Sequence, residues 1–165
     1  MERAGRHPAA GNAPEDAWAD APALRDAAEI LARSDADQAE ADQTRTRYAA
    51  EGMPTLEPDA RIAPLLGPGE RVVAVRHSAQ LDRRLPEPGP EGPAGLGGDL
   101  YVTSRRLVLV GRVTLSFDLA EIEDAVISGE RLLLVVRGGR GFSLDVAGPR
   151  LLRVKIAAAR ASAGG

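Results

Sequence analysis

The sequence predicts a mainly β domain with α structure: seven antiparallel strands in a small barrel or sheet, a closing C-terminal helix, and a helical arm in front. Three observations support this fold class. Residues 98–119 contain two β-rich runs that meet at a polar corner, and a third run that follows Gly111. Residues 122–146 contain three further runs separated by glycine-containing turns. Residues 150–161 repeat apolar side chains at helical spacing after Gly148 and Pro149.

Composition and charge divide the chain into four parts. We expect a disordered tail over residues 1–14, an acidic, alanine-rich helical arm over 15–51, a linker with prolines and glycines over 52–69, and the domain over 70–163. Residues 1–60 carry six arginines and thirteen acidic residues, a balance of −7, whereas residues 61–165 carry fifteen basic and eleven acidic residues, a balance of +4. The net charge of −3 therefore conceals an acidic arm on a mildly basic domain.

The helical arm has one short apolar stripe. Leu24 and Leu31 recur at helical spacing, and Trp18 lies just ahead of them. Beyond Arg33 only alanines and Tyr48 remain as apolar surface. Two interpretations are open: a polar, partly frayed helix with no binding role, or a dimerisation or docking helix that uses Trp18, Leu24 and Leu31.

Alternating apolar residues and intervening turns predict the seven strands over residues 71–79, 99–103, 106–110, 114–119, 122–127, 131–137 and 142–146. In the first strand, Val73, Val75 and Ala79 are expected to face the interior. Residues 82–98 carry four prolines and five glycines, so we expect them to form a long loop outside the sheet. Gly138 and Gly139 predict a two-residue hairpin turn.

Three short motifs resemble a known domain family. Residues 66–72 read Leu-Gly-Pro-Gly-Glu-Arg-Val, residues 100–109 read Leu-Tyr-Val-Thr-Ser-Arg-Arg-Leu-Val-Leu, and residues 119–122 read Leu-Ala-Glu-Ile. They resemble the motifs of bacterial pleckstrin-homology-like and GRAM-like domains, over about 100 residues from Leu65 onward. The resemblance implies a split barrel of two roughly orthogonal sheets capped by the C-terminal helix. It also implies a binding or scaffolding role without catalysis.

Five arginines are candidates for binding anions. Pleckstrin-homology domains that bind phosphoinositides carry basic residues at the end of the first strand, in the first loop and on the second strand. The resemblance therefore assigns the first two places to three residues of this chain, Arg76, Arg83 and Arg84, but the predicted second strand contains no cation. Arg105 and Arg106 at the following corner are best interpreted as a solvated turn, and they join the lipid-binding set only in the alternative described below.

The chain lacks the residues that most catalytic and metal sites need. It contains no cysteine, which excludes disulfides, thiolate nucleophiles and cysteine-ligated metals. His77 and Ser78 would lie on opposite faces of a strand, and two histidines do not make a metal site. The arginine- and glycine-rich residues 137–142 are better explained by a hairpin than by RNA binding. We therefore assign no catalytic residue, no metal, no cofactor and no nucleic-acid partner.

The sequence favours a non-catalytic interaction module that binds a protein partner or a second copy of itself. The alternative is a peripheral membrane module that binds anionic lipid headgroups through Arg76, Arg83, Arg84, Arg105 and Arg106. The first residues contain no continuous apolar stretch typical of a signal peptide, and the longest aliphatic run, residues 132–136, is too short to cross a bilayer. We expect a cytoplasmic location, at a membrane surface only if the alternative holds.

Overall fold

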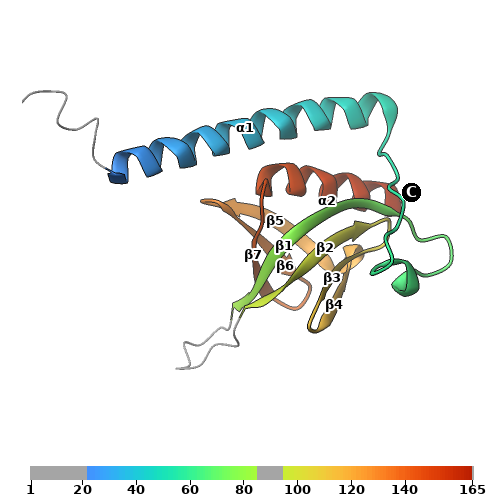
Figure 1. Cartoon of the computed structure of the whole chain (residues 1–165). Helices are drawn as coiled ribbons and strands as arrows, with labels where there is room; N and C mark the ends of the chain where they lie inside the picture. Colours follow the sequence, from blue (N-terminus) through green and yellow to red (C-terminus); the bar gives the residue numbers. More distant parts are fainter. Residues whose placement is uncertain (1–21, 85–94, 165) are drawn as a thin grey trace, which may run out of the picture. The chain divides into compact units, whose positions relative to one another are not determined.

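The computed structural model describes residues 22–84 and 95–164 (Figure 1). The chain divides into two compact units between Arg33 and Ser34. Helix α1, Pro22–Glu51, crosses this division, and all strands and the second helix belong to the unit that begins at Ser34. Within the described residues, no helix combines the length and the apolar character needed to cross a membrane.

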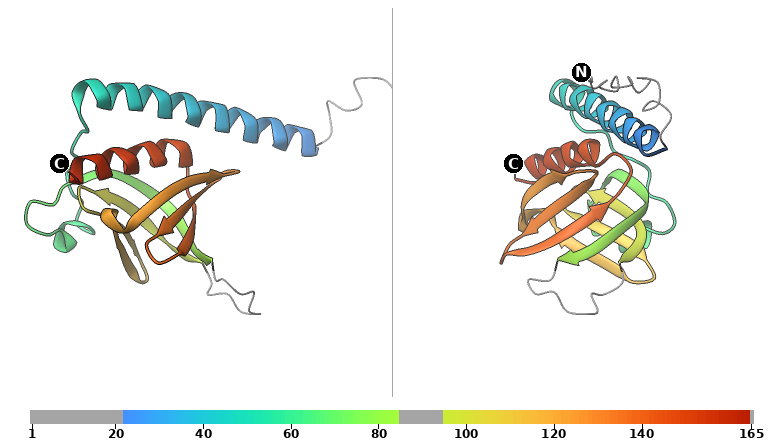
Figure 2. Two further views of the ribbon diagram at one scale, coloured as in Figure 1. Left: turned by 180° about the vertical axis from the view of Figure 1, so that it is seen from behind. Right: turned by 90° about the vertical axis from the view of Figure 1, so that its left-hand side faces the viewer.

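Seven strands form one antiparallel sheet in the order β4-β3-β2-β1-β7-β6-β5. They are β1 (Val72–Arg84), β2 (Leu96–Thr103), β3 (Arg106–Gly111), β4 (Thr114–Asp118), β5 (Ile122–Ser128), β6 (Arg131–Val136) and β7 (Arg140–Asp145). Two short 3₁₀ turns, Ala63–Leu65 and Leu119–Glu121, precede β1 and β5, and helix α2, Pro149–Ala163, follows β7. Figure 2 shows a strongly curved sheet with α2 lying across one end of the curve. The predicted fold class, a seven-stranded antiparallel split barrel with a C-terminal helix, is confirmed.

The main core fills the space between the concave face of the sheet and α2. Every strand from β1 to β7 contributes to it, and α2 adds the apolar face formed by Leu152, Ile156 and Ala159, all no more than 1% exposed. These three residues recur at positions i, i+4 and i+7, so one stripe of the helix faces the sheet. The alternating pattern in β6, with Leu132, Leu134 and Val136 buried, gives the opposite wall.

Strand β1 is less regular than the alternating pattern of its sequence predicts. Its pairing with β2 shifts register twice, before Ala74 and before Ala79, and Ser78 adopts a positive φ of 58°. Each such bulge inserts an extra residue and changes which face the following side chains occupy. The prediction that Val73, Val75 and Ala79 share the inner face is therefore wrong for Val75, which packs on the outer face.

The predicted loop over residues 82–98 is also partly wrong. Asp82, Arg83 and Arg84 pair with Ser143, Phe142 and Gly141 of β7, and the segment from Leu96 to Gly98 pairs with β1. Prolines remove ladder hydrogen bonds at their own positions only, and the partner that recruits these residues lies some 60 residues away in the sequence. Strand β1 thus joins β2 on one side to β7 on the other, which links the two halves of the barrel. Residues 85–94 lie outside the described residues.

The segment before β1 covers the outer face of the sheet. Ile62 is fully buried there against Val72, Tyr101, Val108 and Val110. Leu56 adds an isolated β-bridge to Val72. Leu66 packs on this cluster, whereas the preceding Leu65 is 38% exposed.

The β6–β7 turn is one residue longer than predicted. Val136 pairs with Arg140, so the loop contains three residues, Arg137 to Gly139. Gly138 and Gly139 both have positive φ, 87° and 75°, which explains why glycine occupies both positions. The two-residue prediction was wrong because Arg137 leaves the ladder ahead of the glycines.

Candidate functional site

Arg106 belongs to a buried polar cluster behind the β2–β3 turn. Its guanidinium donates from Nε to Oε1 of Glu70 at 2.9 Å and from Nη2 to Oε2 at 3.0 Å. The hydroxyl of Thr103 and the backbone N–H of Gly67 donate to the same carboxylate, at 2.7 and 2.8 Å. The side chain of Glu70 is 2% exposed and that of Arg106 is 26% exposed. The interpretation of Arg106 as part of a solvated turn is therefore wrong, because the carboxylate holds it.

The ionisation of this cluster follows from the same contacts. Burial opposes the charged form of Glu70, but hydrogen bonds from Arg106, Gly67 and Thr103 outweigh burial and lower the pKa of Glu70 to about 2. The hydrogen bond to Glu70 raises the pKa of Arg106. Glu70, Thr103 and Arg106 all belong to the motifs that carry the family resemblance. These motif positions therefore stabilise the start of the domain.

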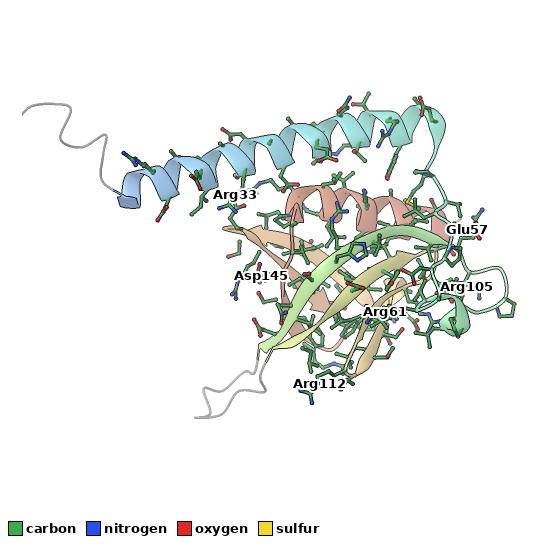
Figure 3. All side chains as sticks on the ribbon, viewed as in Figure 1. Arg33, Glu57, Arg61, Arg105, Arg112 and Asp145 are labelled. Atoms are coloured by element: carbon green, nitrogen blue, oxygen red, sulfur yellow. The ribbon has the colours of Figure 1, made fainter. Side chains whose placement is uncertain are left out.

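The five candidate arginines do not form one patch. Arg83 and Arg84 lie at the far end of β1, and their side chains are outside the described residues. Arg105 and Arg106 follow Thr103, which lies at the opposite end beside Val72. Since β1 contains 13 residues, about 40 Å of strand separates the two pairs at ~3.3 Å per residue. Figure 3 shows Arg105, which is exposed, at one end of β3 and Arg112 toward the other.

The fifth arginine, Arg76, lies between these pairs and is half-buried. Its Nη1 donates to the carbonyl oxygen of its neighbour Val75 at 3.0 Å. Asp99, on the adjacent strand β2, forms an ion pair with Arg61, and its Oδ1 lies 3.2 Å from Nδ1 of His77. Asp99 therefore offsets positive charge on the outer face of the β1–β2 pair, whereas Arg76 pairs with Leu100 of the main core and its guanidinium lies near Gly148 at the start of α2.

The carboxylate of Asp59 holds the segment before β1. It accepts a 2.7 Å hydrogen bond from the phenol of Tyr101 and further bonds from the backbone N–H groups of Arg61 and Ile62. Burial and this contact raise the pKa of Tyr101 to about 12. Within residues 22–84 and 95–164, no group of three or more histidine and acidic side chains is placed to hold a metal ion.

Of the three predicted docking residues, the structure describes the side chain of Leu31 alone. Trp18 lies outside the described residues, and Leu24 lies within α1 but its side chain is not described. Leu31 is 65% exposed, and its neighbour Ile30 is 42% exposed. The docking role of this stripe remains a prediction.

The later part of α1 packs on α2, which the sequence analysis did not predict. Ala41 is buried in a small apolar cluster with Leu151 and Val154. Asp37, 9% exposed, accepts hydrogen bonds from the backbone N–H groups of Arg150 at 2.8 Å and Leu151 at 3.0 Å. These bonds replace those of an N-cap side chain, which the glycine at that position, Gly148, cannot make.

A weak sequence signal for this contact exists in retrospect. Asp37, Ala41, Thr44 and Tyr48 are the four positions between residues 37 and 48 that are not exposed, and they recur at intervals of four, three and four residues. The stripe is short, and its side chains are mostly small or polar, so a pattern of large apolar side chains does not reveal it. Its charged member, Asp37, is explained only by a helix terminus more than 110 residues away.

A groove of about 700 Å³ runs between this part of α1 and α2. Its surface is largely formed by small and apolar residues of both helices, together with Met53 and with Ile127 of β5. Three arginines, Arg45, Arg150 and Arg153, are the charged residues that line it, and no carboxylate does. All lining residues belong to the unit that begins at Ser34. Pockets that bind small molecules in proteins have volumes in this range and are mostly apolar, so the groove is a candidate binding surface.

Comparisons with known proteins bear on the fold alone. A scan against protein-family models and a search of curated proteins find no match. Among solved structures, the chain is similar to the Vps36 N-terminal PH domain, with 17% identity and a TM-score of 0.47, over 64% of this chain and 91% of that one. It is also similar to the C-terminal domain of an unknown protein from Leishmania infantum, with 19% identity and a TM-score of 0.37, over 47% of this chain and 71% of that one.

Proposed function

We propose that this chain is a non-catalytic interaction module, similar to the bacterial pleckstrin-homology-like and GRAM-like domains, that binds a protein through its N-terminal helix. The observation that carries the proposal is the exposure of Leu31, 65%, and of Ile30 beside it, 42%. Two adjacent large aliphatic side chains on one helix are an apolar surface that a partner can cover. The most direct partner is a second copy of the chain, with Trp18 and Leu24 extending the contact.

The test is the molar mass of the full chain by light scattering over a range of concentrations. We expect a dimer for the wild type and a monomer for Leu31→Asp, which places a charge in the contact. Ala32→Asp is the matched control, because Ala32 is the next residue, is also exposed and carries the same new charge. A dimer that Leu31→Asp leaves intact, or a wild type that is monomeric throughout, would overturn the proposal.

The lipid-binding alternative has weaker support. A headgroup site needs several cations that converge, whereas Arg106 is paired with Glu70 and Arg105 lies at the opposite end of β1 from Arg84. The separating measurement is cosedimentation with vesicles containing anionic lipid at low and at high salt. Binding that disappears at high salt would support the alternative, since surface attraction to charged lipid is screened by salt. Absence of binding at low salt would exclude it.

A further inference from the structure

Three cations lie close together where α1, α2 and β1 meet. Arg76 belongs to β1, Lys155 to α2 and Arg47 to α1, all within the second unit of the chain. Arg76 is paired with Leu100 of the main core, and paired residues share a face, so Arg76 is on the side of the sheet where α2 packs. Its Nη2 lies 3.9 Å from the point that a Cβ at Gly148, at the start of α2, would occupy.

The ammonium of Lys155 experiences the charges of the other two cations. Lys155 is half-buried, and this burial lowers its pKa. The positive charges of Arg76 and Arg47 lower the pKa further, whereas the carboxylate of Glu40 opposes the shift. Three positive charges and one negative charge leave a local balance of +2 around Lys155.

Among the residues that the structure describes, no carboxylate forms an ion pair with any of these three cations. Lys155 makes no hydrogen bond to a described residue, Arg76 donates only to the carbonyl oxygen of Val75, and Arg47 lies 5.8 Å from the ring of Tyr48. No buried side-chain nitrogen or oxygen in this part of the chain lacks a hydrogen bond. The unbonded Nζ of Lys155 and Nη2 of Arg76 are therefore accessible to a ligand from solvent.

Two further polar side chains border this space. Thr44 follows Glu40 by four residues on α1 and precedes Arg47 by three, so the three share one side of the helix. Thr44 is 2% exposed, and its hydroxyl, which donates to no described residue, is free to donate to a ligand. Asp37 lies near the start of α2, but its carboxylate already accepts two backbone N–H bonds and pairs with Arg150.

We propose that Arg76, Lys155 and Arg47 bind a small divalent oxyanion, such as the phosphate group of a phosphomonoester. Guanidinium groups match pairs of phosphate oxygens, and an ammonium adds a compact positive charge. A dianion balances the local charge of these cations. The site is independent of the proposed protein contact, and Arg76 is its one residue in common with the five arginines of the lipid-binding alternative.

The test is an NMR titration of the full chain with inorganic phosphate at pH 7, in sodium chloride adjusted to constant ionic strength so that screening does not change. We expect amide signals around Lys155 to shift, with a dissociation constant in the low millimolar range. Lys155→Met keeps the length of the side chain without its charge and should raise this constant at least about tenfold. Arg153→Met is the control, because Arg153 is exposed and lines the groove on another side of α2, and it should change the constant by less than about twofold.

Two measurements separate binding from a structural role. Because the fold disfavours the charged form of Lys155, Lys155→Met should unfold at the same urea concentration as the wild type or a higher one. Arg47→Gln, at an exposed position, should keep the wild-type midpoint and weaken phosphate binding several-fold. A wild type that does not bind phosphate, an affinity that both variants leave unchanged, or a lower midpoint for Lys155→Met would overturn the proposal.

Cosedimentation with phosphatidylcholine vesicles that contain a phosphatidylinositol monophosphate identifies the source of the phosphate group. Vesicle binding that Lys155→Met abolishes would support a lipid headgroup as the ligand. Phosphate binding in solution without vesicle binding would support a soluble phosphomonoester.

Discussion

The cluster of Glu70, Thr103 and Arg106 makes a quantitative prediction. Glu70→Gln keeps the size of the side chain and removes its charge, so it imitates protonation of the carboxyl group. The pKa of Glu70 falls from 4.5 to about 2 in the folded chain. At 1.36 kcal/mol per unit, the charged form is stabilised by about 3 kcal/mol relative to the neutral one. A loss of this size agrees with the ~3–5 kcal/mol that removal of one partner from a buried ion pair costs.

The pH dependence has a definite sign. Because the folded-state pKa lies below the unfolded value, the unfolded chain binds more protons between pH 4.5 and about 2. The stabilisation from Glu70 is therefore complete above pH 4.5 and is lost as the pH falls toward 2. We expect Glu70→Gln to lower the free energy of unfolding by about 3 kcal/mol at pH 7, and by less than half as much at pH 3.

Urea denaturation monitored by circular dichroism measures both values. Glu57→Gln is the control, because Glu57 is exposed and the same substitution there should change stability by less than about 0.5 kcal/mol. A second variant, Arg106→Gln, should show a similar loss, and the double variant should lose much less than the sum of the two. A loss below about 1 kcal/mol for Glu70→Gln at pH 7, or one that is equal at pH 3, would refute the reasoning.

Two further predictions concern the packing of the domain. Asp37→Ala removes the two hydrogen bonds at the start of α2 and should lower the unfolding free energy by about 1–2 kcal/mol, whereas Asp35→Ala, on the exposed side of α1, should change it little in the same urea titration. Gly111→Ala would place a Cβ 2.0 Å from the carbonyl oxygen of Gly97, so we expect the free energy of unfolding to fall by about 2 kcal/mol. Gly67→Ala is the control, because no atom lies closer than 3.4 Å to a Cβ at that position. Equal midpoints of thermal unfolding for the two variants would contradict the prediction.

The strands were predictable because their signals are local. In β6, buried Leu132, Leu134 and Val136 alternate with more exposed neighbours, and the glycines after it are required by positive φ at the turn. The predictions were wrong where the conformation of a segment depends on residues that are distant in the sequence. Arg84 pairs with Gly141 across 57 positions of the sequence, and no pattern within residues 82–98 reveals that pairing.

The same distinction between local sequence signals and distant partners applies to the candidate site residues. The arginines were identified by their residue type, and residue type does not show that Arg106 faces the carboxylate of Glu70. Nor does it show that Asp37 lies at the start of α2. In both cases the side chain satisfies a polar group that the fold creates elsewhere, so its role depends on the tertiary structure.

The division between Arg33 and Ser34 leads to a last prediction about shortened chains. A chain that begins at Ser34 keeps Asp37 and Ala41, so it should unfold at the same urea concentration as the full chain and remain monomeric, because it lacks Leu31. A chain that begins at Thr55 loses the cap on α2 and uncovers Leu151 and Val154. The cap contributes about 1 kcal/mol, and partial exposure of two aliphatic side chains costs a further ~1–3 kcal/mol.

We therefore expect the shorter of the two chains to be about 2–4 kcal/mol less stable, with a correspondingly lower urea midpoint. Its exposed Leu151 and Val154 also create an apolar patch, so aggregation of that chain would reflect loss of cover from α1 and would not reveal a natural contact. Equal midpoints for the two shortened chains would show that residues 34–54 add nothing to the stability of the domain. The groove beside α2 would then be a poor candidate for a permanent surface, because one of its two walls would be free to leave.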